Sequence, residues 1–312
     1  MLFLIKTLKH HFRHQLSIAA VLISLLLSGA FIALDQAFRI ESIITSACAY
    51  TPAIYPIEFL KNAMVYYLAV FVLYIFRLIR IENPRKFLVI SALGLLFYSV
   101  YSAFYAHISL IKLAAVPCRI WLHHVIENVS GLITLALPLW FLWRITQKKS
   151  INGFYGLHAR NLTPLRYIDV MLLVVAAMYF AMHLPGLAEY YPVLDNSYFR
   201  VCAAYFQVPK WLTALGFEVS YALDFVWVEL FFRGFLVLGM LRFLGKDAIL
   251  PMAVLYVVIH FGKPIPEVIS SFFGGYLLGV VAYHTQHIRA GILLHIVLAM
   301  SAEIFAILMR SY

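Results

Sequence analysis

Long runs of apolar residues separated by short polar segments account for most of the chain. Within the runs the apolar residues are continuous rather than alternating, which is typical of membrane helices and not of the strands of a membrane barrel. The pattern therefore predicts an all-α, polytopic membrane bundle of about nine transmembrane helices. The sixth run is longer than one span requires, so we expect it to tilt or to break near Gly216. The runs cover residues 16–34, 62–79, 87–108, 126–145, 167–186, 212–240, 249–262, 267–284 and 289–309.

The composition agrees with this fold class. Of the 312 residues, 64% are hydrophobic and only 12% are charged, which excludes an ordinary soluble globular protein. The net charge is +10, but the Lys and Arg residues lie in short segments beside the apolar runs, where they set topology and meet lipid headgroups. The sequence therefore predicts the lipid bilayer as a partner and excludes nucleic acid.

The basic residues also indicate an orientation and a division of the chain. They are more frequent in the loops on the side of the N-terminus, so we expect a cytoplasmic N-terminus in an integral, multi-pass protein of the bacterial inner membrane. The first run is long enough to be an uncleaved helix rather than a signal peptide. A basic segment, 144–166, separates an N-terminal four-helix region, residues 1–166, from a C-terminal five-helix region, residues 167–312.

The cysteines carry no metal-binding or redox spacing. Cys48, Cys118 and Cys202 form no Cys-x-x-Cys pair, which argues against a zinc knuckle or a thioredoxin-type motif. All three fall on the predicted outer side, where one disulfide is permitted, but we expect free thiols.

Three C-terminal runs carry polar residues that lipid rejects. Glu229 and Arg233 are four residues apart and share one helix face, while His260 and His295 lie in two later runs. A carboxylate and two imidazoles can activate water and stabilise an oxyanion, as hydrolysis requires. The same trio, Glu229, His260 and His295, suits a divalent metal such as zinc, although the sequence does not require a cofactor. An ion pair that only joins two helices is the other interpretation of Glu229 and Arg233.

Three motifs carry a resemblance to a known family. Glu229-Leu-Phe-Phe-Arg233-Gly234, Tyr256-x-x-x-His260 and Gly291-Ile-Leu-Leu-His295 resemble, in order and spacing, the motifs of the CPBP family, which comprises CAAX prenyl proteases and bacteriocin-processing or Abi proteins. The resemblance covers about residues 212–309. It implies a CPBP-like core in the C-terminal part of the bundle and an intramembrane endopeptidase site in which the carboxylate and the two histidines are catalytic and Arg233 and Tyr256 support them.

Three positions differ from the usual family motifs. Val228 occupies the place of a first glutamate, to which water activation is usually assigned, Tyr256 replaces a phenylalanine, and Ala299 replaces an asparagine that helps to hold the oxyanion. We expect Glu229 to act as the base in place of the missing glutamate, and Glu303 to supply the polar group missing at position 299.

Three functions are compatible with these residues. The first is an intramembrane endopeptidase that hydrolyses a peptide bond of a membrane-associated protein or peptide. The second is a catalytically impaired CPBP relative that acts as a membrane binding or immunity-type protein. The third, a transporter, is disfavoured because the sequence has no evident inverted repeat. Convergence of Glu229, His260 and His295 favours catalysis, whereas a Glu229 that contacts Arg233 alone favours binding.

Overall fold

The computed structural model describes residues 2–147, 153–157 and 167–310, and the elements among these residues are helical. In chain order they are α1 (Leu2–His14), α2 (Ile18–Phe38), α3 (Ile40–Cys48), α4 (Ile54–Ile75), α5 (Pro84–Ser102), α6 (Ile108–Ile111), η1 (Val116–Cys118), α7 (Arg119–Gly131), η2 (Leu132–Ala136), α8 (Leu137–Thr146), α9 (Ile168–Ala181), α10 (Leu187–Tyr190), η4 (Val193–Ser197), α11 (Phe199–Phe206), α12 (Lys210–Glu229), η5 (Leu230–Gly239), α13 (Leu241–Leu244), η6 (Gly245–Ala248), α14 (Ile249–Val258), α15 (Ile265–Thr285) and α16 (Arg289–Arg310).

Six segments of the described chain are long and apolar enough to cross a membrane: α2, α4, α5, the continuous segment Val116–Thr146, α15 and α16. The predicted all-α membrane bundle is therefore confirmed, but the count of nine helices is not. Two of the predicted spans are too short for the roughly 20 residues that a bilayer requires, since α9 has 14 residues and α14 has 10. The proposed boundary at residue 166 lies outside the described residues, and the division into two regions stays a prediction.

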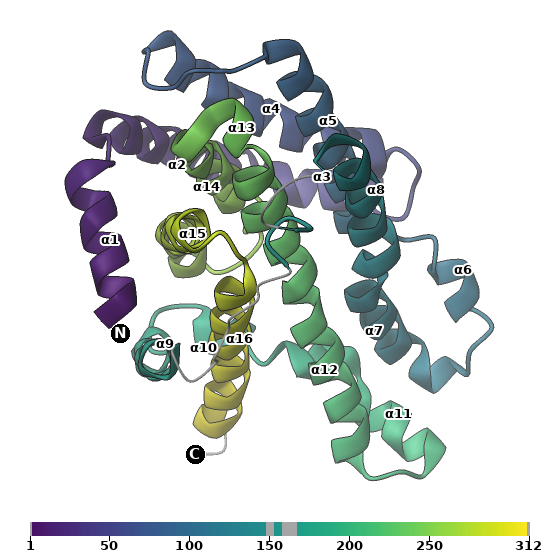
Figure 1. Cartoon of the computed structure of the whole chain (residues 1–312). Helices are drawn as coiled ribbons and strands as arrows, with labels where there is room; N and C mark the ends of the chain where they lie inside the picture. The colour runs from purple at the N-terminus through teal and green to yellow at the C-terminus, as the bar shows by residue number, and fades with distance from the viewer. Residues whose placement is uncertain (1, 148–152, 158–166, 311–312) are drawn as a thin grey trace.

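Helix α14 lies beside α2 in the bundle, partly behind α13 in the view of Figure 1. All ten of its residues are buried, and it packs against α15, α4 and α2. The largest hydrophobic cluster accordingly contains side chains from α4 and α5 as well as from η5 and α14. Helices from both parts of the chain thus enclose the short α14, which carries Tyr256 of the second predicted motif.

The sequence predicted a tilt or a break of the sixth run near Gly216, but α12 does not break there. It continues through this glycine, where a Cβ atom would lie 2.9 Å from the Trp121 ring, so the glycine permits close packing against α7. The irregularity comes later, because α12 changes at Leu230 into the π-helix η5, whose ten residues are all buried. Short π-helical segments inside α-helices are frequent at functional sites.

A disulfide joins Cys118 of η1 to Cys202 of α11. The expectation of free thiols was therefore wrong for these two residues, while Cys48 is free. The two cysteines are 84 residues apart in the sequence, and no local pattern indicates the pairing.

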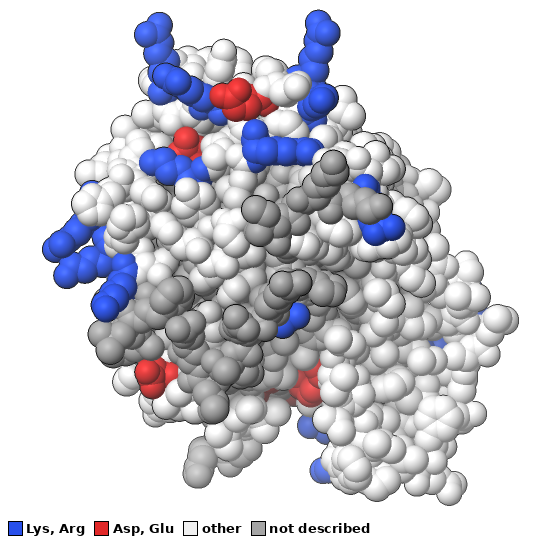
Figure 2. Space-filling model, viewed as in Figure 1, with Lys and Arg blue, Asp and Glu red and all other residues white. Residues whose placement is uncertain are grey.

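Basic side chains gather where α4 and α5 meet, at the top of the view in Figure 2. The exposed residues there include Arg77, Arg80, Arg85 and Lys86. Most of the surface below them in this view is uncharged, as expected of a protein that faces lipid. The sequence places this end in the cytoplasm, and that orientation stays a prediction.

Candidate active site

Glu229 is shared between a cation and an imidazole. It ends α12, Arg233 lies one turn further in η5, and His295 projects from α16. The Oε1 atom of Glu229 is 2.9 Å from Nη1 of Arg233 and 3.0 Å from Nδ1 of His295. Both charged side chains have an exposed fraction of 0%, so the ion pair offsets part of the large cost of burying them. Glu229 is therefore not paired with Arg233 alone.

Helix α16 carries a glycine where it passes this carboxylate. Gly291 lies one turn before His295, and a Cβ atom at this position would collide with Oε2 of Glu229. Small residues allow helices to approach closely in membrane bundles. The glycine of the third motif is thus what allows His295 to reach Glu229.

The hydrogen bonds of His295 define which of its nitrogens is basic. Because the carboxylate of Glu229 is an acceptor, the protonated Nδ1 of His295 donates a hydrogen bond to it. The neutral imidazole then has a free electron pair on Nε2, which lies 3.5 Å from the hydroxyl of Tyr256. A carboxylate that holds a histidine in this tautomer is the arrangement of hydrolases in which the histidine takes a proton.

Tyr256 and His260 complete the group from α14 and the residues that follow it. The guanidinium carbon of Arg233 lies 4.2 Å from the centroid of the Tyr256 ring, a cation–π contact. His260 donates from Nδ1 to the carbonyl oxygen of Tyr256 over 2.7 Å. The Nε2 atom of His260 is therefore also an acceptor.

Tyr256, His260 and His295 lie between two cavities. The first, the polar cavity, has a volume of about 300 Å³ and also contains Asp224 and Lys263 among its lining residues. The second, the apolar cavity, has a volume of about 270 Å³. Its apolar lining residues include Val170, Val174, Leu277, Leu278, Leu294 and Leu298. The two histidines thus have a polar compartment on one side and a hydrocarbon-like compartment on the other.

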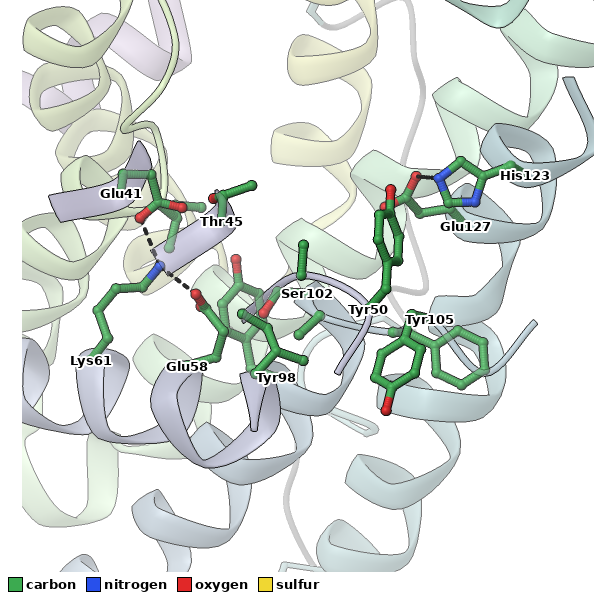
Figure 3. Close-up of a pocket in the computed structure, with 15 residues that line it drawn as sticks. Glu41, Thr45, Tyr50, Glu58, Lys61, Tyr98, Ser102, Tyr105, His123 and Glu127 are labelled. Atoms are coloured by element: carbon green, nitrogen blue, oxygen red, sulfur yellow. Dashed lines mark hydrogen bonds and ion pairs between the residues drawn. The ribbon is translucent and has the colours of Figure 1, made fainter. Parts of the chain in front are cut away.

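A third cavity, the vestibule, adjoins the polar cavity and has a volume of about 290 Å³ (Figure 3). On one side of it, Lys61 lies 2.7 Å from Glu58 and 2.9 Å from Glu41, and on the other side lie His123 and Glu127. Burial raises the pKa of Glu41, and the charge of Lys61 acts in the opposite direction.

The vestibule and the polar cavity share four lining residues, namely Tyr98, Ser102, Glu127 and Ile259. The helices α3, α4, α5 and α7 therefore provide a polar approach to the site, a role that the sequence did not indicate.

The structure brings together five of the six predicted site residues: Glu229, Arg233, Tyr256, His260 and His295. It does not bring Glu303 to them, which corrects the expectation that Glu303 replaces the missing polar group. Both oxygens of Glu303 accept backbone hydrogen bonds instead, from Val193 at 2.7 Å and from Leu194 at 3.0 Å. Its role is to hold η4 against α16.

Sequence reasoning did not assign Asp224 to the site. This residue lines the polar cavity together with Val228 and accepts a hydrogen bond from the hydroxyl of Tyr101. The signal was present in the sequence, since Asp224 lies four residues before Val228 and hence on the same helix face. A carboxylate therefore faces the cavity one turn away from the position where the family usually has its first glutamate.

The helical membrane fold and this group of residues resemble those of intramembrane proteases of the CPBP family. Residues 210–301 match the family named Rce1-like, which is described as type II CAAX prenyl endopeptidase Rce1-like. The predicted resemblance is thereby confirmed for the C-terminal part of the chain, and the five site residues all fall within the match, whereas Glu303 falls outside it. No curated protein and no solved structure matches the chain.

Proposed function

We propose that this protein hydrolyses a peptide bond of a membrane-associated protein or peptide, and that His295 is the base that activates the water. The observation that supports this assignment is the 3.0 Å contact between Oε1 of Glu229 and Nδ1 of His295, which leaves Nε2 of His295 basic at the wall of both cavities. Because Glu229 contacts His295 as well as Arg233, the geometry favours catalysis over the binding alternative.

The reaction uses groups that line the cavities. Nε2 of His295 takes a proton from water as the water oxygen bonds to the scissile carbonyl carbon. The hydroxyl of Tyr256 donates a hydrogen bond to the oxyanion that forms. When the tetrahedral intermediate collapses, the carbon–nitrogen bond breaks and the imidazolium of His295 returns its proton to the leaving amine. His260 is an acceptor on the same cavity wall and orients the water.

This mechanism changes the role expected of Glu229. Its side chain is fully buried and is not among the residues that line the cavities, so it positions His295 and stabilises the imidazolium rather than contacting water. A zinc ion held by Glu229, His260 and His295 stays a prediction, and no step of the mechanism depends on it.

The proposal is tested by comparing the termini of membrane proteins between cells that express the wild-type protein and cells that express His295→Ala. We expect new termini with the wild-type protein that the variant does not produce. His183→Ala is the matched control, because His183 is an exposed residue after α9, and it should give the wild-type pattern. Identical termini with and without His295 would leave no support for proteolysis.

The apolar cavity is proposed to hold an apolar group of the substrate during cleavage. Gly274 lines this cavity, and a Cβ atom added there meets nothing within 4 Å. Gly274→Ala should therefore cleave as the wild type does, whereas Gly274→Phe should fill the cavity and lower kcat/KM about tenfold or more, mainly through KM. The measurement is the cleavage rate of a substrate identified from its new terminus. Equal rates for the two variants would exclude the cavity from substrate binding.

A further inference from the structure

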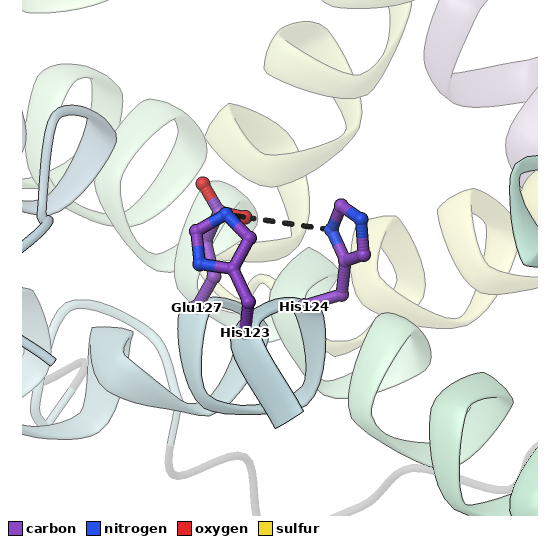
Figure 4. Close-up of side chains that lie close together, drawn as sticks. All are labelled: His123, His124 and Glu127. Atoms are coloured by element: carbon purple, nitrogen blue, oxygen red, sulfur yellow. Dashed lines mark ion pairs between the residues drawn. The ribbon is translucent and has the colours of Figure 1, made fainter. Parts of the chain in front are cut away.

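A cluster of two imidazoles and a carboxylate lies on α7, outside the segment that matches the family. His123, His124 and Glu127 occupy one turn of this helix, and the carboxylate lies between the two rings (Figure 4). Oε2 of Glu127 is 3.7 Å from Nε2 of His123 and 3.7 Å from Nδ1 of His124. All three ligand atoms lie within 4.8 Å of one another.

We propose that His123, His124 and Glu127 bind a divalent metal ion of the zinc class at the wall of the vestibule. Imidazole nitrogen and carboxylate oxygen are zinc ligands at about 2.0–2.2 Å, which places two ligand atoms of a tetrahedral site about 3.4 Å apart. The observed 3.7 Å separations exceed a hydrogen bond and approach this value. Small side-chain adjustments therefore suffice to surround an ion.

A contact with a further histidine, His107, orients the ligand His123. Nε2 of His107, from the segment that precedes α6, lies 2.8 Å from Nδ1 of His123, and the two rings stack with centroids 5.0 Å apart. The Nδ1 atom of His123 thus has a partner, and Nε2 is the atom directed toward Glu127. Metal-binding histidines usually have such a partner on the second nitrogen, which fixes the ring and its tautomer.

The position of the cluster makes the site both accessible and connected to the peptidase site. The exposed fractions of the ligand side chains are 21% for His123, 30% for His124 and 46% for Glu127, so an ion can enter. Three protein ligands leave a fourth position open for water, as in catalytic zinc sites. Glu127 lines the vestibule and the polar cavity alike, so the ion would lie where these two cavities meet. The inference does not depend on the proposed peptidase mechanism.

The experiment is a zinc titration of the full-length protein in detergent, after EDTA treatment and desalting, in competition with a chromophoric zinc chelator. We expect one tightly bound Zn²⁺ per chain. His124→Ala and Glu127→Gln should weaken this binding at least about tenfold, and His107→Phe about 10–100-fold. His183→Ala is the control and should bind as the wild type does.

Thermal unfolding of the same proteins separates loss of the site from loss of the fold. Zn²⁺ should raise the melting temperature of the wild type but not of His124→Ala or Glu127→Gln, while the metal-free melting temperatures agree. His295→Ala should keep the zinc affinity. Zinc binding that is abolished by His295→Ala but unchanged by His124→Ala, or a wild-type protein that binds no stoichiometric zinc, would overturn the proposal.

Discussion

Glu229→Gln is expected to lower kcat by about 10²–10⁴-fold with little change in KM. The amide can donate a hydrogen bond to Nδ1 of His295, which moves the imidazole proton to Nε2 and removes the electron pair that takes the proton from water. It also no longer carries the negative charge that stabilises the imidazolium. The measurement is steady-state cleavage of a substrate identified from its new terminus.

The controls for this prediction use carboxylates and the imidazole itself. Glu189→Gln changes an exposed glutamate and should leave kcat unchanged. His295→Ala should lose about as much activity as Glu229→Gln, and the double variant should lose no more, because the two residues act as one unit. If Asp224→Asn abolishes cleavage while Glu229→Gln retains it, the base is Asp224 and our assignment of His295 is wrong.

Arg233→Met should destabilise the protein by about 3–5 kcal/mol, because it leaves the fully buried carboxylate of Glu229 without its cation. The effect should be reversed by a second change. Glu229→Leu combined with Arg233→Met replaces the pair with apolar side chains and should recover most of the stability while the protein stays inactive.

Denaturant unfolding in detergent measures these differences. The matched control is Arg200→Met, which removes an exposed ion pair with Asp195 and should cost at most about 1 kcal/mol. If Arg233→Met lowers the free energy of unfolding no more than Arg200→Met does, the buried pair contributes little to stability. A double variant as unstable as the single one would show that Arg233 stabilises the bundle through contacts other than that with Glu229.

The sequence predicted those parts of the site that depend on helical periodicity. Glu229 and Arg233 share a helix face because they are four residues apart, and lipid disfavours both unless they meet a partner. The same reasoning identified Tyr256 and His260. The long apolar runs likewise predicted an all-α membrane bundle, because only helices and closed barrels satisfy the backbone in lipid.

Other features depend on packing between distant segments, which spacing does not encode. Glu303 lies two turns after His295 and resembled a member of the site, but the end of α16 meets η4, whose backbone amides bind its carboxylate. The pairing of Cys118 with Cys202 depends in the same way on how η1 meets α11. The run 249–262 is the shortest of the nine apolar runs, so a short helix was indicated, but the pattern did not show that α14 ends at Val258.

The glycine at position 291 has a consequence for related chains. The hydrogen atom of Gly291 faces Glu229, so even one added methyl group would push α12 and α16 apart. The imidazole of His295, which lies one turn further along α16, would then move away from its carboxylate. The size of this one side chain thus sets the separation of the two helices, and with it the alignment of acid and base. A relative with all the polar residues of the site but a larger residue here would need a different helix separation to bring its acid and base into contact.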